Sequence, residues 1–210
     1  MASSQQNDEE NFARIHLLLM KPCRKLMKAF FERLVKDTSP GTSIDGFLNT
    51  KQKQILKTHH GKYNMWKYFP PNQQTDVDAW DIGMLFHMTN LCPSNSNTVT
   101  IYYHVHDIKH MRDTLCHQSK PLISESEYTC YRQRIQDFIN DVLQYLKDQT
   151  LQDEIDRDVQ HIDLPIEKEL IDVYKDMCGY IVQQIQGKKQ SYTIGDCKHA
   201  YFNNNFVVLR

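Results

Sequence analysis

The residues best suited to chemistry lie in one predicted helix, at about residues 99–116. Apolar residues recur there at steps of four and three, and Arg112 occupies one position of that apolar line. A guanidinium is costly to bury alone. Arg112 must therefore pair with a carboxylate such as Asp81, reach the edge of the core, or face a subunit interface.

A second, polar stripe follows a different side of this helix, with His106, His110, Asp113 and His117 at steps of four, three and four. Two kinds of chemistry fit the helix. Arg112 and His117 could act together on a phosphodiester, because an imidazole moves protons near neutral pH and a guanidinium holds phosphate. Alternatively, the stripe could share a zinc ion, since ligands at i and i+4 lie on one helix face. A solvated histidine-rich face beside a structural arginine is the plain alternative to both.

Arg112 and His117 do not lie side by side on a straight helix. Residues five apart on a straight helix point about 140° away from each other. The two side chains can converge if the helix frays at Cys116, or if a second subunit brings its own copy across a two-fold axis. The catalytic interpretation therefore predicts a homodimer with this helix near its axis.

The composition is that of a globular protein, with 40% hydrophobic and 24% charged residues among 210. Lys plus Arg number 25 against 26 Asp plus Glu, so RNA binding would need a local basic patch. No apolar run approaches the roughly 20 residues of a membrane helix, and the start does not resemble a signal peptide. The six cysteines form no Cys-x-x-Cys pair, which predicts reduced thiols in a cytoplasmic protein. We expect no metal, no cofactor and no membrane partner.

Helical periodicity predicts an all-α fold. Residues 1–10 are polar and acidic and are expected to be a disordered start. The helical domain is expected to span residues 11–148, with Pro22 beginning its second helix. Further helices are expected at 47–56, 76–91, 99–116 and 125–148, the last opened by a capping box from Ser124 to Glu127. Residues 149–210 are expected to form a C-terminal extension, with a helix at about 165–186 and an extended segment at 192–209 that could be a short hairpin.

Five elements occur in an order that resembles a known family. They are the run from Glu10 to Leu19, the second helix to Phe31, a lysine-rich helix leading to Tyr68-Phe69-Pro70-Pro71, the stretch from Trp80-Asp81-Ile82 to Asn90-Leu91-Cys92, and the helix ending in Arg112-Asp113-Thr114-Leu115-Cys116-His117. Together they cover about residues 11–148 and resemble one subfamily of the HEPN superfamily. This is the domain found in DAZ-interacting zinc-finger ubiquitin ligase and in related multidomain animal proteins. Asp113 stands where many relatives have Asn, and one residue fewer separates the arginine from the histidine.

The resemblance implies a HEPN-type helical bundle that forms a homodimer through the helices carrying Arg112 and His117. In active members these residues cut single-stranded RNA without a metal. Here His117 would transfer the proton, Arg112 would stabilise the phosphorane and Asp113 would orient His117. His110, His106 and Asp81 would support the site or bind substrate, and the setting would be innate defence or stress signalling. Other members are inactive and serve as dimerisation or nucleotide- or RNA-binding modules, which is the alternative function.

Overall fold

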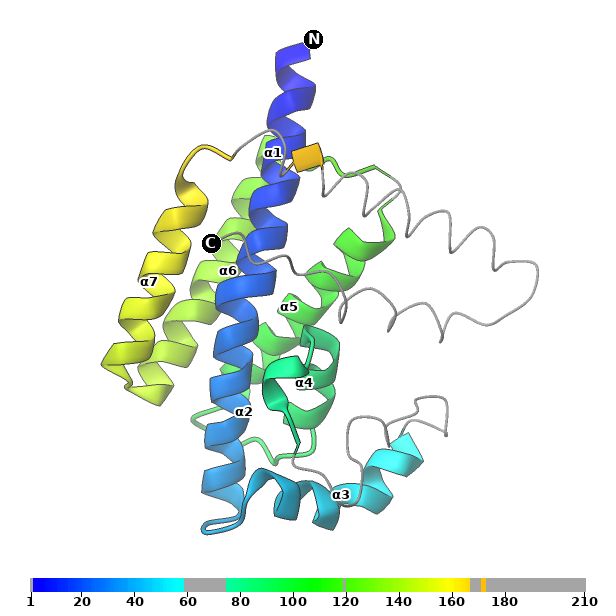
Figure 1. The fold of residues 1–210 in the computed structure, drawn as a ribbon, viewed down its shortest axis with the longest axis vertical. Helices are drawn as coiled ribbons and strands as arrows, with labels where there is room; N and C mark the ends of the chain where they lie inside the picture. Colours follow the sequence, from blue (N-terminus) through cyan, green and yellow to red (C-terminus); the bar gives the residue numbers. More distant parts are fainter. Residues whose placement is uncertain (1, 59–74, 119, 167–170, 173–210) are drawn as a thin grey trace, which may run out of the picture.

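The computed structural model describes residues 2–58, 75–118, 120–166 and 171–172, and the regular elements in these ranges are all helical (Figure 1). This confirms the predicted all-α class. The Tyr68–Pro71 element, most of the helix expected at about 165–186 and the extended segment at 192–209 lie outside the described residues.

One long rod runs through the molecule from the N-terminus (blue in Figure 1). It consists of α1 (Ala2–Leu18), a π-helical turn η1 (Leu19–Cys23) and α2 (Arg24–Thr38). Pro22 lies inside η1 and does not begin a new helix as expected. Backbone angles are helical on both sides, with φ −60° and ψ −41° at Leu18 and φ −62° and ψ −43° at Arg24. A π-turn moves the hydrogen-bond pattern by one residue, which accommodates a proline without an N–H.

The rod also begins earlier than the sequence suggested. We expected residues 1–10 to be disordered, but α1 begins at Ala2. The loop before α6 holds this part of α1 in place, because the Ile123 N–H donates to the Asp8 carbonyl at 3.0 Å. The Asn11 side-chain amide donates to the Ile123 carbonyl at 3.4 Å and to Glu125 Oε2 at 3.1 Å. These contacts with a segment more than a hundred residues away are not visible in the local composition.

The remaining elements are α3 (Ile44–Thr58), a 3₁₀ turn η3 (Val77–Ala79), α4 (Ile82–Thr89), α5 (Val99–His117), α6 (Glu125–Leu146) and α7 (Gln149–Asp163). The helix expected at 76–91 is thus divided at Trp80 and Asp81. Asp81 is the N-cap of α4 and accepts the Met84 N–H at 2.8 Å. The capping box predicted at Ser124 and Glu127 is confirmed.

The core joins these helices into one bundle. α5 packs between α6 and α4, while α2 contacts both α4 and α6. The largest fully buried side chains are aromatic: Trp80, Phe12, Phe30, Phe31, Phe47 and Phe138. α7 lies along α1 (Figure 1), buries Ile155 and Ile162, and pairs Glu154 and Asp158 with Lys25 of α2. The bundle therefore continues to residue 163, beyond the expected boundary at 148.

Candidate functional site

Arg112 lies inside the bundle, and its side chain is only 7% exposed. Its Nη2 donates to Asp81 Oδ2 at 2.7 Å and its Nη1 donates to Asp113 Oδ1 at 2.9 Å. Burial follows from the pattern of α5, because Arg112 shares the apolar line of Val105, Ile108 and other residues that face the core. The sequence left three environments possible for Arg112: a carboxylate partner, the edge of the core, or a subunit interface. The structure shows the first of these.

Asp81 takes part in two interactions at the start of α4. One carboxylate oxygen accepts the Met84 N–H of the first helical turn, and the other accepts the Arg112 guanidinium. A carboxylate is favoured at this position by the positive end of the helix dipole as well as by the cation. The same side chain therefore starts α4 and fixes α4 against α5.

Asp113 extends the cluster towards the surface. Its second oxygen lies 2.6 Å from Lys109 Nζ, one turn earlier on α5. Burial opposes ionisation of Asp113, but hydrogen bonds from Lys109 and Arg112 outweigh it and lower the pKa of this carboxyl. Burial likewise opposes the charge of Arg112, but Asp81, Cys116 and Asp113 together outweigh it, so the pKa of Arg112 is raised. Two cations, Lys109 and Arg112, and two anions, Asp81 and Asp113, thus meet here and balance in formal charge.

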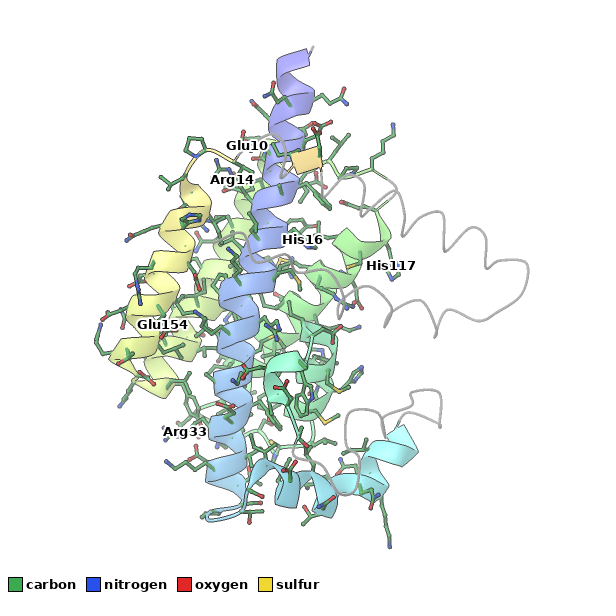
Figure 2. The ribbon with its side chains drawn as sticks, viewed as in Figure 1. Glu10, Arg14, His16, Arg33, His117 and Glu154 are labelled. Atoms are coloured by element: carbon green, nitrogen blue, oxygen red, sulfur yellow. The ribbon has the colours of Figure 1, made fainter. Side chains whose placement is uncertain are left out.

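His16 is a neighbour of this cluster that the sequence did not reveal. It lies on α1 (Figure 2), partly buried, with its ring stacked on Phe12 at a centroid distance of 6.2 Å. Burial and the nearby charge of Arg112 lower the pKa of His16 to about 4. The imidazole is therefore neutral at neutral pH. This environment arises from burial within the bundle and from the Arg112 charge on another helix, and a histidine four residues after Phe12 was the one local sign of it.

His117 lies apart from Arg112. It is exposed at the C-terminal end of α5, where Figure 2 labels it, whereas the Arg112 side chain is buried. One chain therefore does not present the two side chains on a common surface. The structure brings together Arg112, Asp113 and Asp81 of the predicted site, and leaves His117 outside that cluster.

His106 and His110 are also exposed on α5. The His106 ring meets Phe86 of α4 edge to face, with centroids 4.7 Å apart. In the part of the chain that the structure describes, no three His, Cys, Asp or Glu side chains gather as a metal site. The four-residue zinc interpretation of the stripe is therefore not supported by the geometry.

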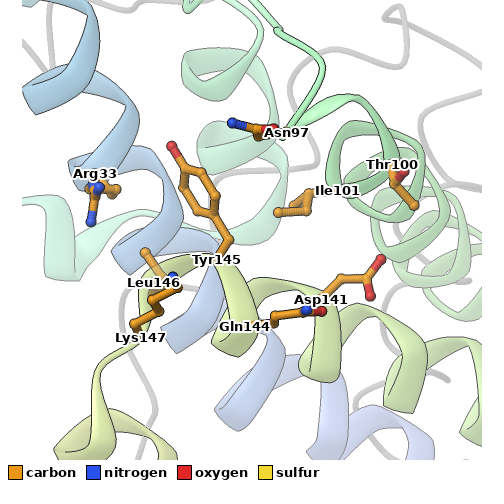
Figure 3. A pocket seen from close by; sticks show the side chains of 9 residues that line it. All are labelled: Arg33, Asn97, Thr100, Ile101, Asp141, Gln144, Tyr145, Leu146 and Lys147. Atoms are coloured by element: carbon orange, nitrogen blue, oxygen red, sulfur yellow. The ribbon is translucent and has the colours of Figure 1, made fainter.

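Apart from the Arg112 cluster, a pocket of about 620 Å³ lies where α2 and α6 end and α5 begins (Figure 3). Its lining is Arg33, Asn97, Thr100, Ile101, Asp141, Gln144, Tyr145, Leu146 and Lys147. Several of its polar groups already have partners. Arg33 Nε contacts Asp37 at 2.9 Å and its guanidinium covers the Tyr145 ring at 5.5 Å, while the Tyr145 hydroxyl donates to Asp37 at 2.8 Å. Burial, with Asp37, raises the pKa of Tyr145 to about 12, so it remains protonated. None of the predicted site residues lines this pocket.

Comparisons with protein-family models, curated proteins and solved structures found no match. Among the described helices, none has the length and apolar character needed to cross a membrane.

Proposed function

We propose that this chain is a HEPN-type helical domain that acts as a self-association module and does not cleave RNA. The all-helical bundle and the order of its elements support the HEPN-type assignment. The observation that carries the functional choice is the burial of Arg112 between Asp81 and Asp113. An arginine that must stabilise a phosphorane has to reach the phosphate, and this one is held inside the bundle by two carboxylates.

Self-association is supported by the outer stripe of α5, which we define as Val99, Tyr103, His106, His110 and His117. All five are exposed, and they recur at steps of four, three, four and seven, the spacing of a helix-packing seam. Tyr103 is 71% exposed and Val99 42%, although both are large and hydrophobic. Tyrosine is enriched where proteins meet, because its ring is apolar and its hydroxyl tolerates water.

The length of α5 suits such an interface. Its 19 residues span about 28 Å. Two such helices crossing about a two-fold axis would bury the stripe of each against the other, as in other symmetric dimers. A stable dimer needs roughly 1,000 Å² or more of total buried surface, so residues flanking α5 would also take part.

RNA cleavage is the second candidate, and one observation favours it. His117 is exposed at the end of α5, where its imidazole is open to a substrate. For cleavage, a second copy would have to bring a cation to His117, or Arg112 would have to leave Asp81. The second event needs a rearrangement of the buried cluster.

Light scattering on the purified chain tests the proposed association. At high micromolar concentration we expect a mass near twice the 24.9 kDa of one chain. A mass that stays at the monomer value over the whole concentration range would reject the association proposal. Incubation with labelled RNA in EDTA separates this function from cleavage.

A further inference from the structure

We propose that His106 and His110 form a two-imidazole site for a divalent late first-row transition-metal ion on the surface of α5. The two residues are four apart, within a helix that is regular from Val99 to His117, and both are exposed. This site is distinct from the four-residue zinc site that the geometry does not support. Because His106 and His110 also belong to the outer stripe of α5, an ion bound there would compete with the proposed association, and the site is open in the single chain. It does not depend on the fate of RNA.

The helix provides the required spacing. Side chains at i and i+4 lie about 5–6 Å apart at their Cβ atoms. From that separation two imidazoles can turn one ring nitrogen each towards a common ion at roughly 2.0–2.1 Å, as paired histidines on a helix do in zinc enzymes. No movement of the backbone is needed, because both residues already share one face.

The surroundings restrict one ligand and leave the other mobile. The His106 ring packs edge to face on Phe86, at an interplanar angle of 88°. This contact limits the rotamers of His106, so less conformational entropy is lost when it binds an ion. His110 is exposed and can adjust to the ion.

Neighbouring charges do not occupy the site. The Lys109 ammonium, which would repel a cation, lies 5.6 Å from the centroid of the Phe86 ring, and its pairing with Asp113 at 2.6 Å offsets its charge. Asp107 is paired with Arg134 of α6 at 2.6 Å, and His104 with Asp141 at 3.2 Å, so both face away from the pair. Since no third protein ligand gathers in the described residues, water would complete the coordination shell.

Imidazole ligands suit copper, nickel and zinc rather than magnesium or calcium. Water-completed coordination with two nitrogen donors is compatible with the geometries that Ni²⁺ and Cu²⁺ prefer. The general order of divalent-metal affinities then predicts that Cu²⁺ binds more tightly than Ni²⁺.

Calorimetric titration of the whole chain with Ni²⁺, without any added histidine tag and at a protein concentration where light scattering gives the monomer mass, tests the proposal. We expect His106→Ala and His110→Ala each to weaken this binding by about tenfold or more, as loss of a metal-site residue commonly does. His104→Ala and His117→Ala, which remove histidines from the same helix, should bind Ni²⁺ as the wild type does. Circular dichroism checks that all four variants fold.

The proposal is wrong if the wild type binds no Ni²⁺ at millimolar metal, or if either His106→Ala or His110→Ala retains wild-type affinity. Equal losses in His104→Ala and His117→Ala would also overturn it, because they would mean diffuse binding by many histidines. Light scattering on the same samples reports association separately, so failure of the metal site and failure of the association proposal give different results.

Discussion

Arg112 Nη2 and Asp81 Oδ2 lie 2.7 Å apart, and this contact joins the buried middle of α5 to the first turn of α4. α4 also needs Asp81 for another reason, since its second oxygen accepts the Met84 N–H at the start of that helix. The pair therefore has a structural role that does not require any substrate. Its position explains why an arginine can occupy the apolar line of α5.

Removing Asp81 should strongly destabilise the fold. Asp81→Ala leaves the Arg112 charge buried without its main partner, and such changes typically cost about 3–5 kcal/mol. The free energy of unfolding from urea titration measures this. Asp78→Ala is the matched control, because Asp78 pairs with Lys28 at an exposed site, where the loss is about 0–1 kcal/mol. Equal losses in the two variants would show that the Arg112 pair is not structural.

A double-mutant cycle isolates the pair itself. Asp81→Asn retains a side chain able to cap α4 but removes the charge, and Arg112→Met replaces the guanidinium with an apolar chain of similar length. Because the double variant buries no unpaired charge, its destabilisation should be smaller than the sum of the two single losses. Strict additivity would mean that Arg112 and Asp81 do not stabilise each other.

His16 should make stability depend on pH. Its folded-state pKa of about 4 lies below the 6.5 of a free imidazole, so the unfolded chain binds more protons between these values. The part of the free energy of unfolding that depends on neutral His16 is therefore complete above pH 6.5 and is lost as the pH falls towards 4. The loss is up to about 3 kcal/mol, at 1.36 kcal/mol per pKa unit. Urea unfolding at several pH values should show that the free energy of unfolding changes less with pH in His16→Gln than in the wild type. Parallel curves for the two proteins would contradict this assignment.

The capping box of α6 offers a test that does not involve the candidate site. The Ser124 hydroxyl accepts the Glu127 N–H while the Glu127 carboxylate accepts the Ser124 N–H. Ser124→Ala should lower the free energy of unfolding by about 1 kcal/mol, the usual value for an N-cap. Ser96→Ala, at an exposed position of the turn before α5, should change it by less than half as much. The prediction fails if the two alanine variants are equally stable.

Tyr103 should be decisive for self-association. Tyr103→Arg places like charges opposite each other across a two-fold interface, so the dissociation constant of the dimer should rise about tenfold or more. The fold should stay intact, because the position is exposed. Light scattering over a dilution series measures the change. Leu164→Arg is the control, since Leu164 is exposed after α7, away from the stripe. A dimer unaffected by Tyr103→Arg would place any interface elsewhere.

Local signals in the sequence predicted much of the fold, and tertiary contacts account for what they missed. α6 was predictable because its apolar period and its capping box agree. The partner of Arg112 was also predictable, because few acids are available to a buried arginine and Asp81 begins the neighbouring helix. The environment of His16 was not, since it depends on burial in the bundle and on the charge of Arg112, nearly a hundred residues further along the chain. The packing of α7 was missed because Ile155 and Ile162 are the only buried positions in an otherwise charged helix.

The measurement that tests the central claim most directly is RNA cleavage by the wild type and by His117→Ala, with labelled single-stranded RNA in EDTA at micromolar protein. If Arg112 is structural and the domain associates without cutting, RNA should remain intact for hours with both proteins, at the level of a buffer control. A wild-type rate that exceeds the His117→Ala rate by about 10²-fold or more, the usual contribution of general acid–base catalysis, would contradict the account.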